Sequence, residues 1–232
     1  MTAWLALGLG PLLAGCSTAQ TGAPVAQEDL AANMDDWLIE KWDKEPVRVD
    51  LKDGKLHIST EPDNGEDGVM VWLKRDLPAN FTFEYDFTPL SEHGFYLIFF
   101  CAQGLNGQDV TSPQMQARGD FQTLFIKYTG KKAPSRSYHI SYRRGNEANC
   151  NLRKNPGLNL LKQTVLDQLL PQDKTVHVKL TKRDKDIKLE VGGKTFMEYT
   201  DNDQAYSGGR LALRQVYRAE ALYSNMTLTE IK

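Results

Sequence analysis

The strongest constraint on the fold is the strict alternation of aromatic and polar residues between Phe81 and Phe87. Every second residue of FTFEYDF is aromatic, and a polar residue stands at each position between. Successive side chains of a strand point to opposite faces, so this run predicts a half-buried antiparallel strand. Residues 95–102 (FYLIFFCA) are apolar on both faces, which is typical of a central strand that is covered on both sides.

Short alternating runs separated by turn residues continue along the whole chain. Runs at 47–51 and 55–59 flank Asp53-Gly54, which is a strong hairpin signal. We expect further strands at 69–74, 123–128, 137–144, 175–182, 187–191, 195–199, 210–217 and 222–231. Residues 159–170 fit either a short helix or a strand with a loop, and residues 28–37 fit a short helical turn. Many short strands with few helix signals predict an all-β fold, a concanavalin-like jelly-roll sandwich of two curved antiparallel sheets over residues 28–232.

The composition argues against a nucleic-acid partner. The chain has 232 residues, 41% hydrophobic and 25% charged, and a formal net charge of −2. A nucleic-acid-binding protein needs a strongly basic face to release counterions. The local cluster of basic residues between Arg143 and Lys154 therefore indicates a focused site, for which a carboxylate or sulfate group is a fitting partner.

The N-terminal segment predicts export and lipid attachment. An apolar run from Ala3 to Leu13, too short to span a bilayer, is followed by Ala14-Gly15-Cys16. We interpret residues 1–16 as a lipoprotein signal with lipidated Cys16, residues 17–27 as a flexible tether, and the location as the bacterial cell envelope, periplasmic or at the outer-membrane surface. An ordinary cleaved signal with a chance cysteine is the alternative. Cys101 and Cys150 either pair in an oxidising compartment or remain separate buried thiols.

Polar chemistry is concentrated between Ser137 and Pro156 (SYHISYRRGNEANCNLRKNP). Alternation places His139, Ser141 and Arg143 on one face of the opening strand and apolar residues on the other. If the first face lines a concave sheet, the imidazole is available for proton exchange near neutral pH and the guanidinium for gripping a carboxylate. The alternative is a histidine that bonds a strand-edge carbonyl and an arginine that reaches solvent.

These segments supply the candidate site residues. A second row of polar residues lies on the strand 210–218, where Arg214 stands beside Gln215. These residues either contact a ligand or form a solvated surface of the sheet. Aromatic rings that could stack on a pyranose are Tyr96, Tyr142, Tyr217 and Trp72. We assign proton transfer and charge neutralisation to His139, Tyr142 and Arg144, and ligand binding to Arg143, Asn149, Asn151, Arg153, Lys154, Arg214, Gln215 and Tyr96.

Other kinds of site find little support in the sequence. There is no G-x-S-x-G elbow, P-loop or G-x-G-x-x-G motif, and the histidines lack zinc-ligand spacing. We therefore expect no metal or cofactor. The acidic segment 61–68 offers oxygens to calcium, but its spacing fits no EF-hand, so a solvated loop is the preferred interpretation. Glu84 and Asp86 are the one carboxylate pair considered for a two-acid glycosidase.

Several motifs resemble a known family. The segments FFCA at 99–102, YHISY at 138–142 and CNLRK at 150–154, with Arg144 and Gly157, are similar to the bacterial domain-of-unknown-function family 1961 over residues 37–231. The resemblance implies a fold like that of concanavalin-like lectins and glucanases, and a role in polysaccharide utilisation, without an established reaction. The short connection between Arg144 and Cys150 departs from the longer family loop, so no role is carried over from that loop.

Three functions remain open from the sequence. The leading hypothesis is action on an acidic, uronic polysaccharide or oligosaccharide by β-elimination, with arginine or asparagine neutralising the uronate and His139 or a tyrosine moving the proton. The alternatives are a non-catalytic carbohydrate-binding lipoprotein and a glycoside hydrolase. The membrane is expected to be contacted through the lipid anchor only.

Overall fold

The computed structural model describes residues 29–42, 46–61, 68–144, 149–165 and 171–232, without the side chains of residues 143 and 144. The strands are β1 Trp37–Glu40, β2 Val47–Lys52, β3 Lys55–Thr60, β4 Val69–Leu73, β5 Phe81–Pro89, β6 Gly94–Gly104, β7 Ser135–Arg144, β8 Asn149–Asn155, β9 Asn159–Val165, β10 Val176–Arg183, β11 Asp186–Val191, β12 Lys194–Thr200, β13 Arg210–Val216 and β14 Glu220–Glu230. The helices are the short 3-10 turns η1 Leu30–Ala32 and η2 Met34–Asp36, and α1 Pro113–Gln116 and α2 Leu124–Thr129.

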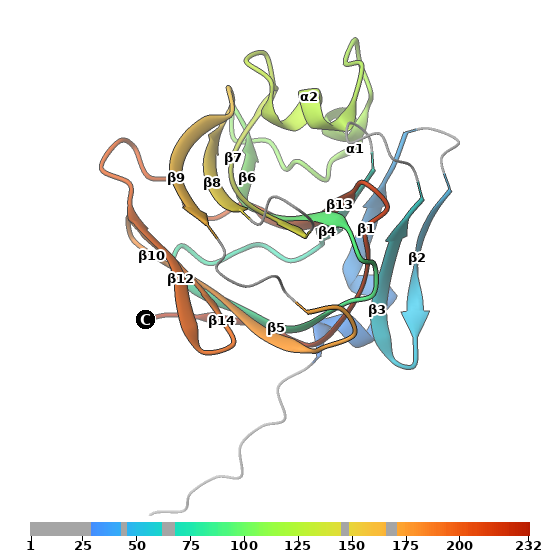
Figure 1. Cartoon of the computed structure of the whole chain (residues 1–232). Coiled ribbons are helices and arrows are strands. Elements are labelled where there is room, and N and C mark those ends of the chain that lie inside the picture. The colour runs from blue at the N-terminus through green and yellow to red at the C-terminus, as the bar shows by residue number, and fades with distance from the viewer. Residues whose placement is uncertain (1–28, 43–45, 62–67, 145–148, 166–170) are drawn as a thin grey trace, which may run out of the picture.

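These strands form two stacked antiparallel sheets (Figure 1). Sheet A has the order β1-β4-β13-β6-β7-β8-β9 and sheet B the order β12-β11-β10-β5-β14-β3-β2. Chain neighbours such as β13 and β14 lie in different sheets, as in a jelly roll. The predicted all-β jelly-roll sandwich of two antiparallel sheets is confirmed.

The main core lies between the two sheets and is built on the alternation first seen in β5. Its four aromatic residues are fully buried and its intervening polar residues are half-buried. Each such aromatic side chain contributes roughly 1.5–3 kcal/mol when it leaves water. β5 occupies the middle of sheet B, so these rings anchor that sheet against sheet A.

The expected hairpin at Asp53-Gly54 is also confirmed. β2 and β3 pair antiparallel from Val47 opposite Thr60 to Lys52 opposite Lys55. The two turn residues have φ values of 52° and 72°, the left-handed conformations that a tight hairpin of this kind needs. The turn therefore fixes the register that puts Leu56 and Ile58 in the core.

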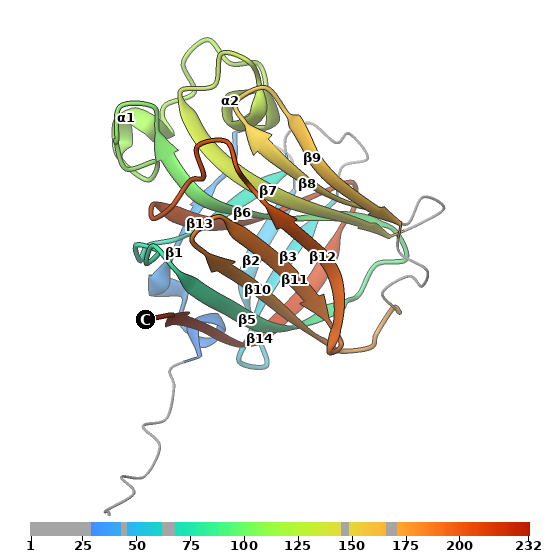
Figure 2. The same cartoon turned by 90° about the vertical axis from the view of Figure 1, so that its left-hand side faces the viewer.

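A second, smaller core lies on the outer face of sheet A. The chain between β6 and β7, residues 105–134, carries α1 and α2, and we call it the insert. Figures 1 and 2 show the insert on the side of sheet A that faces away from sheet B. Its Val110, Met115, Leu124 and Tyr128 pack on apolar residues of β4, β6 and β13. This second layer explains why β6 is buried on both faces, as its sequence predicts.

The expectation of a strand at 123–128 is wrong, because this segment contains α2. Four residues of α2 are buried, and three of them, Leu124, Lys127 and Tyr128, have the i, i+3, i+4 spacing of one helix face; the fourth is Thr129. The side chain of Thr123 caps the helix by accepting a hydrogen bond from the amide of Ile126 at 3.2 Å. A short apolar run fits either period, and here the cap and the partner beneath decide for the helix.

The remaining expectations concern the edges of the sandwich. The helical turn expected near residues 28–37 corresponds to η1 and η2. The ambiguous segment 159–170 forms β9 up to Val165, and residues 166–170 lie outside the described residues.

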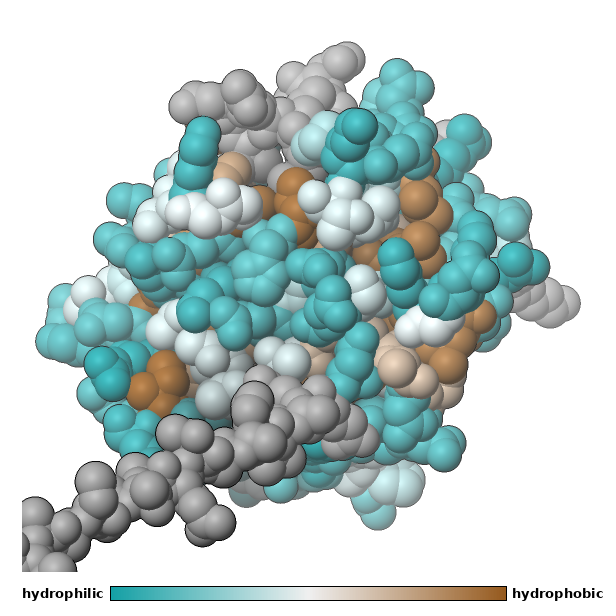
Figure 3. All heavy atoms as spheres, turned by 90° about the horizontal axis from the view of Figure 1, so that it is seen from below, coloured by the Kyte–Doolittle hydropathy of each residue, from teal (hydrophilic) through white to brown (hydrophobic). Residues whose placement is uncertain are grey.

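Figure 3 shows the side of the molecule below sheet B, which is mostly hydrophilic where described atoms are visible. Among the described residues, the helices are all too short or too polar to span a membrane.

Candidate functional site

The register of sheet A places the polar residues of distant strands in rows across its outer face. Residues directly opposite each other in antiparallel strands share a face, and neighbouring strands lie about 4.8 Å apart. One row runs from β4 to β8 and a second from β4 to β9. The first contains Trp72, Ala212, Phe99, His139 and Arg153, and the second contains Met70, Arg214, Leu97, Ser141, Asn151 and Gln163.

His139 and the two arginines Arg153 and Arg214 come together on this face. His139 lies directly opposite Arg153, and both guanidinium groups act on its imidazole. Arg214 is 1% exposed, and its guanidinium lies 5.4 Å from the centre of the Phe125 ring on α2. Arg153 is half-buried and its Nη1 donates to the carbonyl of Leu158 at 2.8 Å. Residues from three strands thus build one cationic cluster beside α2.

His139 is held neutral, which contradicts the expectation that it exchanges a proton near neutral pH. The imidazole is buried, stacks on Phe99 with ring centres 4.9 Å apart, and accepts a hydrogen bond at Nδ1 from Nδ2 of Asn155 at 3.0 Å. Burial, together with Arg153 and Arg214, lowers the pKa of His139 to about 3. The proton of the neutral ring is therefore on Nε2.

Asn151 is one of the groups on this face with spare hydrogen-bonding capacity; among the described residues, Asn155 Oδ1 and Ser135 Oγ are others. Asn151 is 8% exposed and lies opposite Ser141 and Gln163. Its Nδ2 donates to Oδ1 of Asn149 at 3.3 Å, and its Oδ1 has no hydrogen-bond partner among the described residues. Buried carbonyl oxygens in folded proteins are normally hydrogen-bonded, so a ligand donor here would supply the partner that this oxygen lacks.

Four predicted site residues lie elsewhere, and their assignment is corrected. Tyr96, Tyr142 and Gln215 belong to the layer between the sheets, where their polar groups are already used. Tyr142 OH lies 3.0 Å from Tyr85 OH, Tyr96 OH lies 2.9 Å from Ser91 Oγ, and the Gln215 carboxamide lies 2.8 Å from Tyr223 OH.

The fourth, Lys154, is turned away from Arg153. Its Nζ lies 2.8 Å from Asp201 Oδ2 and 4.7 Å from the centre of the Tyr206 ring. On β8 the residues Cys150, Leu152 and Lys154 share the inner face, so strand alternation alone removes this lysine from the site.

Some predicted residues are not placed by the structure. The backbones of Arg143 and Arg144 pair with Phe95 and Gly94, but their side chains lie outside the described part of the chain. The same is true of Cys16 and of most of the acidic segment, residues 62–67. Among the described residues, no group of three or more histidine, cysteine or acidic side chains could hold a metal ion.

The structure also decides three other questions from the sequence: the carboxylate pair for hydrolysis, the rings for sugar stacking, and the pairing of the two cysteines. Glu84 and Asp86 lie on sheet B and pair with Lys179 and His177 there, so they do not share a face with the cationic cluster. Trp72 is buried beneath α2, so it offers no stacking platform, whereas Tyr217 is 40% exposed. Cys101 and Cys150 are separate buried thiols, and burial raises the pKa of each to about 12.

Sequence reasoning missed the group that attaches α2 to the sheet. The Glu40 carboxylate of β1 accepts from Lys127 Nζ at 2.6 Å, Tyr128 OH at 2.7 Å and Trp72 Nε1 at 2.9 Å. All four side chains are buried. Burial lowers the pKa of Lys127 although Glu40 opposes this shift. The i, i+3, i+4 pattern of Leu124, Lys127 and Tyr128 was the available signal.

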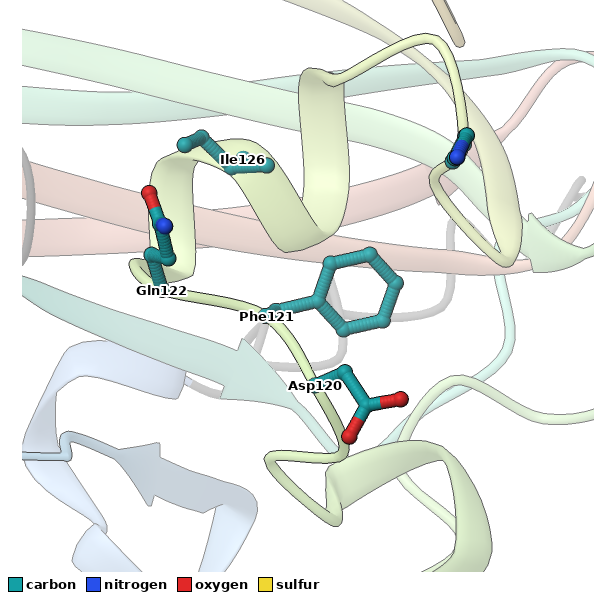
Figure 4. Close-up of a pocket in the computed structure, with 5 residues that line it drawn as sticks. Asp120, Phe121, Gln122 and Ile126 are labelled. Carbon is teal, nitrogen blue, oxygen red and sulfur yellow. The ribbon is translucent and has the colours of Figure 1, made fainter.

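It also missed a hollow of about 470 Å³ on the outer side of α2, which we call the α2 hollow. Its lining residues are Asp120, Phe121, Gln122, Ile126 and Lys132. Figure 4 shows the labelled side chains along the segment that leads into α2 and on the helix itself. The unusual length of the polar segment after residue 102 was the signal in the sequence.

Comparison with known proteins finds relatives over nearly the whole chain. The uncharacterized protein YesU of Bacillus subtilis (strain 168) is 24% identical over 225 residues, which is 89% of this chain and 96% of YesU. A crystal structure of a protein of unknown function with a galectin-like fold, also from Bacillus subtilis, has a TM-score of 0.74 at 23% identity, covering 88% of this chain and 94% of that one.

More distant structures share the fold. The carbohydrate binding module CBM66 from Bacillus subtilis has a TM-score of 0.54 at 12% identity, covering 84% of this chain and 96% of the module. These likenesses establish the galectin-like sandwich. The family described as "Domain of unknown function (DUF1961)" matches residues 26–228, and the chain therefore belongs to that family.

Proposed function

We propose that the chain is a saccharide-binding protein whose ligand contacts the outer face of sheet A at β8 and β9, and that Arg153 receives an acidic group of the sugar. The observation that carries the proposal is the buried Oδ1 of Asn151, which has no hydrogen-bond partner in the described part of the chain and lies two residues from Arg153 on the same strand face. Residues two apart on a strand are about 6.6 Å apart, within the span of one sugar unit and its carboxylate.

The chemistry of this face suits an acidic sugar. The half-buried guanidinium of Arg153 donates to a carboxylate, the Asn151 oxygen accepts from a hydroxyl, and the exposed amide of Gln163 lies in the same row. The similar fold of a carbohydrate binding module supports a saccharide over other anionic ligands.

Binding without chemistry is the form of the proposal that the geometry favours. Of the residues assigned to proton transfer, His139 is neutral and buried and Tyr142 lies between the sheets. β-Elimination needs a base within hydrogen-bond reach of the substrate. The carboxylate pair considered for hydrolysis lies on the other sheet.

The test is isothermal titration of the protein with galacturonate oligosaccharides and with neutral galacto-oligosaccharides, alongside absorbance of unsaturated uronate. We expect affinity for the acidic series that falls as salt is raised, without an absorbance change. Arg153→Ala should weaken binding about tenfold or more, because a charge-assisted hydrogen bond contributes about 1.5–3 kcal/mol.

The matched control is Arg183→Ala, which removes an exposed arginine of sheet B and should leave affinity unchanged. Equal binding of both sugar series, or an Arg153→Ala protein that binds like the wild type, would contradict the role of Arg153. If the wild-type protein raises the absorbance of unsaturated uronate and His139→Ala does not, the non-catalytic form of the proposal is contradicted.

A further inference from the structure

The α2 hollow has the volume of a small-ligand site and is open to solvent on one side. Its volume of about 470 Å³ lies within the range of about 300–1,000 Å³ usual for ligand pockets. Residues 120–122 and Ile126 of α2 line it (Figure 4), and Lys132 completes the lining.

The lining combines an aromatic ring with three kinds of polar group. Phe121 is half-buried and Ile126 is 39% exposed, so together they present apolar surface to a ligand. Asp120, Gln122 and Lys132 are exposed and supply a carboxylate, an amide and an ammonium group. One acid and one base leave the lining without net charge, in contrast to the arginines on the outer face of sheet A.

Arg118 bonds to the backbone of the lining. Arg118 donates through Nε to the carbonyl of Phe121 at 3.3 Å and through Nη2 to that of Gln122 at 3.1 Å. Its guanidinium carbon also lies 5.2 Å from the centre of the Trp42 ring. These bonds hold the backbone of residues 121 and 122 in place, so less ordering of this segment opposes binding.

From these observations we propose that the α2 hollow is a second saccharide site, which takes a neutral pyranose ring. The apolar face of the ring stacks on Phe121, and its hydroxyls bond to Asp120, Gln122 and Lys132. This inference rests on the proposed function, because it assumes that the ligand is a sugar.

The hollow and the face of sheet A lie on either side of α2. Ile126 lines the hollow while the adjacent Phe125 covers Arg214, and a helix with side chains is about 10–12 Å across. One oligosaccharide could therefore reach from the hollow to the face of sheet A.

The experiment is backbone NMR of the protein titrated separately with methyl β-D-galactopyranoside, methyl β-D-glucopyranoside and sodium galacturonate. We expect at least one neutral glycoside to shift the amide signals of Phe121, Gln122 and Ile126, and galacturonate to leave them in place. Phe121→Ala should weaken the neutral glycoside about two- to tenfold, as loss of an aromatic contact predicts. Leu105→Ala, at a 56% exposed position of the same insert, is the matched control and should bind normally.

The outcomes separate this inference from the proposed function. If neither neutral glycoside shifts the hollow, or if galacturonate shifts it equally, the neutral site is overturned whatever happens at Arg153. If the hollow responds as expected while galacturonate shifts nothing near Arg153, the second site is supported and the acidic-sugar proposal fails. Neutral-glycoside affinity that Phe121→Ala does not change would also overturn the inference.

Discussion

His139 shows at residue scale how the fold changes the chemistry of a side chain. Its pKa of about 3 lies below the ordinary value near 6.5, because burial and two guanidinium groups disfavour the charged ring. Between these values the unfolded chain binds the proton and the folded chain does not. The contribution of His139 to stability is therefore fully present above about pH 6.5 and is lost as the pH falls toward 3.

We expect His139→Asn to flatten the acid limb of the stability curve. Wild-type unfolding free energy should fall between pH 6 and 4 by about 1.4 kcal/mol per pH unit more than that of the variant. Urea unfolding at several pH values measures both slopes, and titrating groups common to the two proteins cancel. Equal slopes would show that the imidazole titrates normally in the folded protein.

Strand alternation predicted which face of the sheet most site residues lie on, but it could not predict contacts with residues distant in the sequence. The rule that placed His139 and Ser141 on one face and Tyr138 on the other agrees with the register of β7. The same rule applied to β8 would have assigned Lys154 to the inner face. The rule does not reveal that Phe125, far away in sequence, covers Arg214, so the depth of the site required the structure.

The helix α2 is the element that shapes this face, and both apolar contacts and an ion pair attach it to sheet A. With six residues it is too short to be stable alone. Its apolar contacts and the buried Glu40–Lys127 pair hold it on sheet A. The sequence predicted a strand here because it did not show that β1 supplies a carboxylate for Lys127, the fourth residue of the helix.

We expect Glu40→Ala to destabilise the protein by about 3–5 kcal/mol, because it leaves the Lys127 ammonium buried without its partner. The double variant Glu40→Leu/Lys127→Met should recover part of this loss, since no charge remains buried. Urea unfolding monitored by tryptophan fluorescence gives the two values. A loss below about 1 kcal/mol in Glu40→Ala, or no recovery in the double variant, would contradict the role of the pair.

At the scale of the whole molecule, the sandwich was largely predictable because hairpins and alternation are local signals. The stacking of β5 on sheet A and the burial of β6 on both faces follow from them. The state of the two cysteines was left open, since spacing does not fix their distance, and the structure keeps both as free thiols. The lipid anchor remains a prediction, because residues 1–28 lie outside the described part.

We expect the full chain, expressed in a bacterium with lipoprotein processing, to enter the detergent phase in a phase-partition assay, because acyl chains add about 0.8 kcal/mol per buried methylene. Cys16→Ser should move the protein to the aqueous phase, whereas the neighbouring Ser17→Ala should not. A wild-type protein found in the aqueous phase would refute lipidation at Cys16.

The insert leaves and re-enters the sandwich at one place, with Gly104 directly opposite Ser135 in paired strands. A stretch whose two ends are already neighbours can be lengthened, shortened or exchanged without changing the register of any other strand. The length of the insert is therefore independent of the strand pairing at its two ends. Grafting the corresponding segment of a relative between these two residues should keep the host scaffold only if the graft also supplies a basic partner for Glu40 and apolar side chains for the outer face of sheet A.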